Sequence, residues 1–299
     1  MPPAAPSVAT ALPWLVRLSW LALPFAAGPL LAAGLHERAE AVRTTASVGL
    51  WLVWALVLVA VLVPRPVGLT ALRVAAPAAL AAGGAAVAGA GEGPTTAVTV
   101  AGLAAAALVT VVALLPETGA VFVNGAAYGD ERRLLLRAPG PVLAGPIVVA
   151  WALLVAGVAT GPLLLAAGIW VAGAVALAAG WAVAVVLARA IHSLAERWVV
   201  FVPAGMVLKD HLALVDPVLF RRVDIEALRP APADTDALDL TARSPGLALE
   251  LLLLEKVPLL RATPGRRESR PGKTTRLLFT PTRPGAVLAE ARRRRIAVG

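Results

Sequence analysis

The sequence predicts an α-helical transmembrane bundle of about six spans, at residues 1–190, followed by a small cytoplasmic α+β domain at residues 191–299. The 299 residues are 59% hydrophobic and 15% charged, with a mean hydropathy of +0.81, whereas ordinary soluble domains are about 25% charged. Uncharged or nearly uncharged runs of a length that crosses the hydrocarbon core recur up to residue 190. Beyond it, short apolar stretches alternate with charged residues, Pro and Gly, as in a mostly antiparallel sheet.

Six apolar runs are the expected spans. They lie at residues 13–34, 47–64, 70–90, 95–115, 141–160 and 163–189. The Gly161-Pro162 pair is expected to divide the last two runs into a tight helical hairpin, because proline breaks the helical hydrogen-bond ladder. The first run is interpreted as a span and not as a signal peptide, because no basic segment precedes it and it exceeds a typical apolar signal region.

The basic residues of the loops predict the orientation, since Lys and Arg resist translocation. With both termini in the cytoplasm, five basic residues lie in cytoplasmic loops and two in external loops. The cytoplasmic ones are Arg65, Arg73, Arg132, Arg133 and Arg137, and the external ones are Arg38 and Arg43. The 24 Arg against 3 Lys are typical of a high-G+C bacterial genome. We therefore expect a multi-pass protein of a bacterial plasma membrane.

The expected spans contain no Asp, Glu or His, which argues against proton-coupled transport. Prolines in the first, third and fifth runs leave two interpretations open. They are either the broken helices of a transport path or ordinary kinks covered by neighbouring helices. In the last run, small residues at four-residue spacing predict a flat packing face. They are Ala172, Ala176, Gly180, Ala184 and Ala188.

The loop at residues 117–140 contains the only Asn and the only Tyr, Asn124 and Tyr128, which makes both candidate site residues. Turn signals surround them. The basic segment that follows, with Arg132, Arg133 and Arg137, is expected to lie on an anionic leaflet.

The C-terminal region predicts several strands and one final helix. The strands are expected at 198–202, 206–209, 218–225, 238–242, 247–257 and 275–280, and the helix at 284–295. The apolar run at 247–257 also fits a helix. Three segments, RWVVFVPAGMVLKD (197–210), RRVDIEAL (221–228) and RLLFTPTRPGAVLAEARRRRI (276–296), resemble bacterial pleckstrin-homology-like (PH-like) domains. This resemblance implies a barrel that serves as a binding or scaffolding module, and it transfers no ligand residues.

Charge is divided unevenly within this region. Residues 191–260 have 7 basic and 10 acidic side chains, and residues 261–299 have 11 basic and 2 acidic ones. The basic side chains of residues 261–299 are predicted to contact anionic lipid, since each charge near the surface is attracted by about 1 kcal/mol. The candidate contact residues are Arg266, Arg267, Arg270, Lys273, Arg292, Arg293, Arg294 and Arg295.

No residue pattern supports a cofactor or metal. The PGKTT stretch at 271–275 resembles the end of a phosphate-binding loop, but Arg267 stands where that motif requires glycine. The three histidines are scattered, and the chain has no cysteine. Nucleic-acid binding is not expected, because the basic tail has one aromatic residue.

The sequence therefore favours a scaffold or adaptor that recruits a protein on the cytoplasmic face and lies against an anionic inner leaflet. A transporter or lipid-handling protein with a regulatory cytoplasmic domain is the alternative, and an enzyme ranks last. Oligomeric state stays open.

Overall fold

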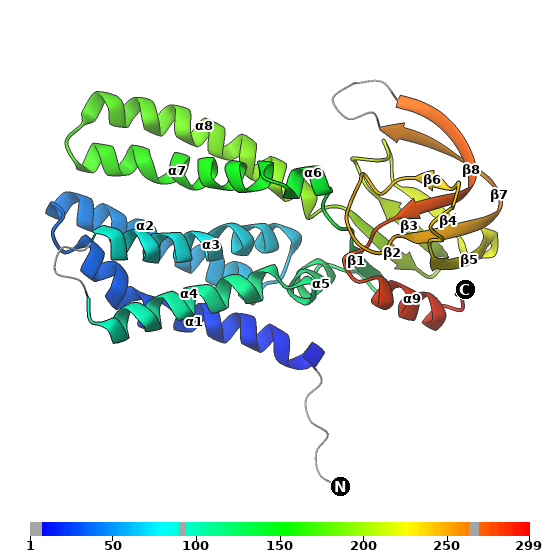
Figure 1. Ribbon diagram of the computed structural model, residues 1–299, viewed down its shortest axis with the longest axis horizontal. Coiled ribbons are helices and arrows are strands. Elements are labelled where there is room, and N and C mark those ends of the chain that lie inside the picture. The colour runs from blue at the N-terminus through cyan, green and yellow to red at the C-terminus, as the bar shows by residue number, and fades with distance from the viewer. Residues whose placement is uncertain (1–7, 90–93, 263–268) are drawn as a thin grey trace, which may run out of the picture. The chain divides into compact units, whose positions relative to one another are not determined.

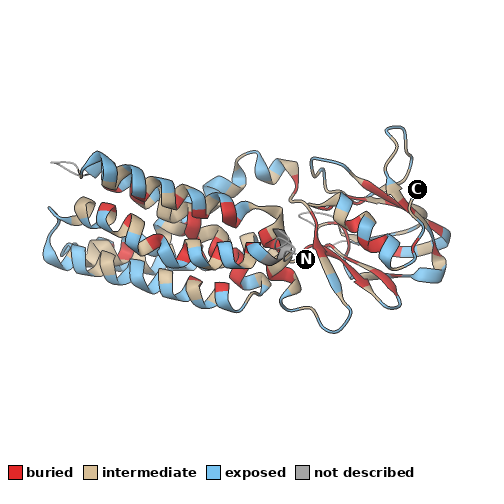
Figure 2. Cartoon of the chain, turned by 90° about the horizontal axis from the view of Figure 1, so that it is seen from below, coloured by how far each residue is buried: buried red, intermediate tan, exposed pale blue. Residues whose placement is uncertain are grey.

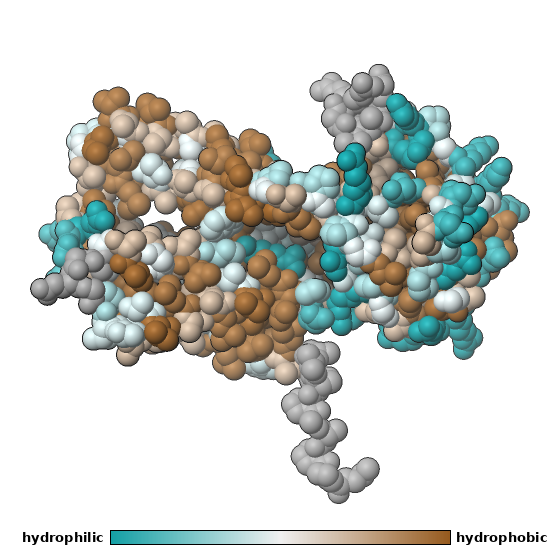
Figure 3. Space-filling view, viewed as in Figure 1, coloured by the Kyte–Doolittle hydropathy of each residue, from teal (hydrophilic) through white to brown (hydrophobic). Residues whose placement is uncertain are grey.

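A computed structural model describes residues 8–89, 94–262 and 269–299 (Figure 1). The chain divides into two compact units. The helical unit comprises residues 1–125 and 149–192, and the sheet unit comprises residues 126–148 and 193–299. Figure 3 shows apolar residues over the long helices and hydrophilic residues over the strands.

Among the described residues, six helices are long and apolar enough to cross a membrane, as the sequence predicts. They are α1 (Val8–Leu35), α2 (Glu40–Leu62), α3 (Pro66–Gly89), α4 (Thr96–Leu114), α7 (Pro146–Ala166) and α8 (Trp170–Leu194). A short helix, α5 (Pro116–Asn124), follows α4. Helix α1 packs against α3 and α4, and α2 packs against α3. The length and composition of these helices indicate a multi-pass membrane protein.

One of the three prolines inside α1, Pro24, has its effect on the backbone compensated by a neighbouring helix. Pro24 has no N–H, so it leaves the carbonyl of Trp20 without its helical donor. The indole Nε1 of Trp54 in α2 donates to this oxygen at 3.0 Å, and Trp20 Nε1 donates in return to the carbonyl of Trp54 at 3.0 Å. The carbonyl that Pro24 leaves without a donor is thereby satisfied through packing of α1 against α2.

The prediction of a hairpin turn at Pro162 is wrong. Helix α7 runs through this proline, and the chain turns at residues 167–169. The carbonyl of Val158, which loses its donor to Pro162, accepts a hydrogen bond from Nε1 of Trp181 in α8 at 3.3 Å. A donor on the neighbouring helix thus compensates for the missing N–H, and the helix continues.

Glycines allow the backbones of α7 and α8 to approach closely. A Cβ added to Gly157 would lie 2.6 Å from the carbonyl oxygen of Gly180, and one added to Gly161 would lie 2.5 Å from Cα of Leu177. Gly173 likewise lies against Leu165. The contact line on α8 therefore follows Gly173, Leu177 and Gly180, at mixed four- and three-residue spacing.

This contact line differs from a strict four-residue stripe. Gly180 lies on it and Ala184 is buried, whereas Ala172 is exposed and Ala176 and Ala188 are partly exposed. Four residues advance a helix by more than one turn of 3.6 residues, so the stripe drifts by about 40° per step. Its two ends consequently lie on different sides of α8.

The sheet unit contains two four-stranded sheets. The first has the order β1 (Arg132–Leu135), β2 (Trp198–Val202), β3 (Gly205–Lys209) and β4 (Val218–Arg221). The second has the order β5 (Ile225–Pro230), β7 (Leu249–Ala262), β8 (Ser269–Phe279) and β6 (Leu238–Asp239). All pairs are antiparallel except β6 with β8. The elements α6 (Gly140–Leu143), η1 (Arg222–Asp224) and α9 (Pro284–Arg293) complete the unit.

Strand β1 comes from the loop between α5 and α7. It pairs with β2 in a register that sets Leu134 opposite Val199, and both side chains are buried. Residues 126–148, which the sequence places with the membrane domain, thus belong to the sheet unit. The ambiguous run at 247–257 is extended and forms most of β7.

One hydrophobic core joins both sheets and α9. It includes Phe201 and Phe220 from the first sheet, Leu251 and Phe279 from the second, and Val287 from the helix. Figure 2 shows buried residues along the strands and on one side of the final helix. This core fixes the loops and helix ends on which the site depends.

Candidate anion-binding groove

The C-terminal end of α9 is a Schellman turn with an unusual residue. The N–H of Ile296 donates to the carbonyl of Ala291 at 2.9 Å, and the N–H of Arg295 donates to that of Arg292 at 3.0 Å. Arg295 has φ of +59°, a left-handed conformation that glycine usually supplies at this position. An arginine there costs about 1 kcal/mol relative to glycine.

A carboxylate fixes the two preceding arginines. Glu290 is almost fully buried, and it accepts from Arg293 Nη2 at 2.6 Å and from Arg294 Nε at 2.8 Å. Burial alone would raise the pKa of Glu290, but the hydrogen bonds from both guanidinium groups outweigh it and lower that pKa below its usual value. Arg294 also donates to the carbonyl of Asp130.

These residues form one wall of a groove with a volume of about 270 Å³. The opposite wall comprises the turn between β2 and β3, and Arg222 of η1, whose N–H donates to the carbonyl of Ala204 at 2.9 Å. The lining residues are Asp130, Val202, Pro203, Gly205, Arg222, Arg293, Arg294, Arg295 and Ile296. The lining contains four arginines and Asp130, and the buried Glu290 pairs with two of these arginines, so the formal net charge of the whole set is about +2 at neutral pH.

The structure separates the basic residues that the sequence assigns to lipid contact. Arg293, Arg294 and Arg295 line the groove, and Arg292 is exposed on α9 outside it. Arg270 and Lys273 lie on β8. Arg266 and Arg267 fall outside the described residues.

The three arginines near β1 have different environments. Arg132 is exposed. Arg133 pairs with Glu131 at 2.9 Å and lies over the ring of Trp198 at 5.5 Å. The carbonyl of Arg137 accepts from Arg197 Nη1 at 2.9 Å and also from Ser244.

The two loop candidates do not join the groove. Asn124 Nδ2 donates to the carbonyl of Ala120 at 2.8 Å within the last turn of α5. Tyr128 is 87% exposed. The sequence did not indicate that Arg222 and Asp130 line this groove. Only the fold brings η1 and the loop before β1 to the end of α9.

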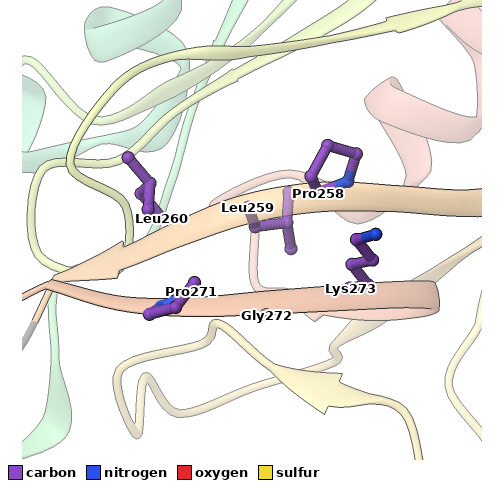
Figure 4. A pocket seen from close by; sticks show the side chains of 6 residues that line it. All are labelled: Pro258, Leu259, Leu260, Pro271, Gly272 and Lys273. Carbon is purple, nitrogen blue, oxygen red and sulfur yellow. The ribbon is translucent and has the colours of Figure 1, made fainter.

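A second hollow, of about 390 Å³, is apolar and lies on the outer half of the β7–β8 hairpin (Figure 4). Its lining residues are Pro258, Leu259, Leu260, Pro271, Gly272 and Lys273. The register sets Pro258 opposite Lys273 and Leu260 opposite Pro271. Strand β6 pairs with β8 only at Leu277 and Leu278, so the outer half of the hairpin continues past it (Figure 1).

Two buried ionic clusters hold the sheet unit together. Arg197 and Asp210 are each 1% exposed and share two hydrogen bonds of 2.7 Å. Glu250 on β7 accepts from Arg229, Arg276 and Thr235. Burial alone would raise the pKa of Glu250, but these three hydrogen bonds lower it overall. Glu250 therefore stabilises the fold as an anion.

Polar contacts in the helical unit connect helices. Thr70 Oγ1 on α3 lies 2.8 Å from His192 Nδ1 on α8, and Arg73 Nε donates to the carbonyl of Ala113 on α4 at 3.2 Å. In the described parts of the chain, no group of three or more His, Cys, Asp and Glu side chains is arranged to hold a metal ion. No family model, curated protein or solved structure matches the chain.

Proposed function

We propose that the chain is a membrane-anchored scaffold, in which the six apolar helices span a bacterial plasma membrane and the sheet unit recruits a protein on the cytoplasmic face. The similarity of three sequence segments to PH-like domains supports a binding module of this kind. The excess of basic residues in the cytoplasmic loops supports the orientation.

The observation that carries the proposal is the apolar surface of the outer β7–β8 hairpin. Leu254 is 63% exposed and Leu260 is 44% exposed, and Leu260 lines the 390 Å³ hollow. Exposed apolar patches with a polar rim mark interaction sites. The exposed charged residues near these leucines are mostly basic: Lys256, Arg270 and Lys273, with Glu255 as the acidic one. The partner surface that fits is therefore an apolar side chain flanked by acidic residues.

The helical unit supports the role of an anchor. The carbonyls that lose their helical donors to Pro24 and Pro162 accept hydrogen bonds from the indoles of Trp54 and Trp181, so both helices stay continuous at these prolines. Close glycine contacts between α7 and α8 serve packing in the same way.

The test is affinity purification of the full chain from gently solubilised membranes of its own cells. Leu260→Glu introduces a charge into the hollow and is expected to abolish recovery of the partner. Leu247→Glu is the matched control, because Leu247 is 50% exposed and does not line the hollow. A partner that co-purifies equally with both variants would contradict the proposal.

Point variants are required here instead of truncation near residue 190. Such a truncation would remove β2 and leave Leu134 and Leu135 of β1 without the strand on which they pack. Exposed apolar strands of this kind aggregate, so loss of a partner would have two explanations.

A further inference from the structure

We propose that the groove at the C-terminal end of α9 binds a phosphate group, carried either by a small soluble phosphomonoester or by a lipid headgroup. Its ligands are Arg222, Arg293 and Arg295. This inference goes beyond the scaffold function, because it assigns a small anion to a surface other than the β7–β8 hairpin.

The charge of the groove matches this ligand. A phosphomonoester has a charge of about −1.5 to −2 near neutral pH, and the groove lining together with the buried Glu290 has a formal net charge of about +2. Guanidinium groups bind phosphate oxygens through paired N–H donors. Glu290 uses some of the N–H donors of Arg293 and Arg294. The side chains of Arg222 and Arg295, in contrast, make no hydrogen bond or ion pair with the described residues.

The backbone of Arg295 supports a function for its side chain. A Schellman turn favours glycine at this position, and the chain keeps an arginine there in a left-handed conformation. Residues held in sparsely populated conformations concentrate at ligand-binding sites, where the strain maintains a useful geometry. The turn directs this arginine into the groove that Arg222 lines from the other side.

The size of the groove limits the ligand. Its volume of about 270 Å³ lies just under the range of about 300–1,000 Å³ for drug-sized ligand pockets. Val202, Pro203 and Ile296 add an apolar side to the lining. A phosphate with a short carbon chain, such as a glycerol phosphate, fits both features.

The test uses the purified full chain in phosphatidylcholine nanodiscs, with inorganic phosphate and glycerol 3-phosphate titrated by calorimetry. Arg295→Gly and Arg222→Gln are each expected to weaken binding about tenfold, as loss of one charge-assisted contact does. The melting temperature of Arg295→Gly is expected to equal or exceed that of the native chain, because glycine suits the turn. A loss of phosphate affinity in Arg295→Gly can therefore be distinguished from a loss of stability.

Arg292→Gln is the matched control. It removes one positive charge from the same helix end, but its side chain does not line the groove, so affinity is expected to stay within twofold. Absence of phosphate binding to the native chain, or an equal loss in Arg292→Gln, would overturn the proposal. Either result would leave the Leu260→Glu purification experiment unaffected.

A second titration distinguishes the two sources of phosphate. Nanodiscs that contain phosphatidic acid present the same phosphomonoester on a lipid. If the natural ligand is a headgroup, phosphatidic acid is expected to compete with soluble phosphate for the groove. Phosphatidylglycerol at the same abundance is then expected not to compete. If the ligand is soluble, neither lipid changes the affinity. Both outcomes require the groove and support the assignment.

Discussion

Removal of one partner of the buried ion pair in the sheet unit should destabilise that unit strongly. Asp210→Ala deletes two hydrogen bonds of 2.7 Å from Arg197, and it also deletes the bond of 3.0 Å from the N–H of Leu212. The guanidinium of Arg197, which is 1% exposed, keeps only the carbonyl of Arg137 as acceptor. An unpaired buried charge of this kind costs about 3–5 kcal/mol.

Hydrogen exchange of the full chain in detergent measures this loss. The amides of β2 and β3, which flank the pair, should exchange by opening of the whole sheet unit. A decrease of about 3–5 kcal/mol in the free energy of unfolding corresponds to exchange roughly 10² to 10⁴ times faster. Amides of the apolar helices serve as the internal reference, because the pair lies within the sheet unit.

A double variant separates the cost of an orphaned charge from the value of the pair. Arg197→Met with Asp210→Leu replaces both charges by apolar side chains of similar length and should recover most of the stability, because buried pairs contribute little net free energy. A loss under about 1 kcal/mol in Asp210→Ala, or a double variant as unstable as the single one, would refute this reasoning.

Two further predictions concern pH and helix packing. Glu250 and Glu290 have lowered pKa values in the folded chain, so their contribution to stability is complete above the unfolded pKa of about 4.3 and is lost as pH falls through the folded values. Acid should therefore loosen the sheet unit below about pH 4.3, as near-ultraviolet circular dichroism can follow, and Glu250→Gln should reduce this dependence; an unchanged acid midpoint would count against it. Gly180→Leu should separate α7 from α8, because a Cβ there would lie 2.6 Å from the carbonyl oxygen of Gly157, whereas Ala172→Leu on the exposed side should leave the melting temperature in detergent unchanged.

The long apolar helices are the part of the fold that the sequence predicts best. Span length is dictated by bilayer thickness, so six runs identify six helices. The turn between the last two was misplaced because proline is a weaker breaker where a neighbouring side chain supplies the missing donor. Trp181 performs this function for Val158, and nothing in the local sequence of α7 shows it.

Non-local pairing limits the prediction for the sheet unit. Strand β1 has four residues, and its partner β2 begins 63 positions later in the chain, beyond two long helices. Local patterns identify Arg293, Arg294 and Arg295 as a basic run, but only tertiary structure brings Arg222 opposite to them. The sequence could therefore identify three of the four arginines of the groove as one basic cluster, and it could not identify the groove's geometry.

The most direct test of the central claim is photo-crosslinking in intact cells. A photoreactive amino acid at position 260 of the full chain should produce one discrete crosslinked protein, because the hollow on the β7–β8 hairpin is proposed to hold a partner on the cytoplasmic side. The same amino acid at position 247 should produce none. Crosslinks to lipid alone at position 260, or the same protein at both positions, would contradict the account of this chain as a membrane-anchored scaffold.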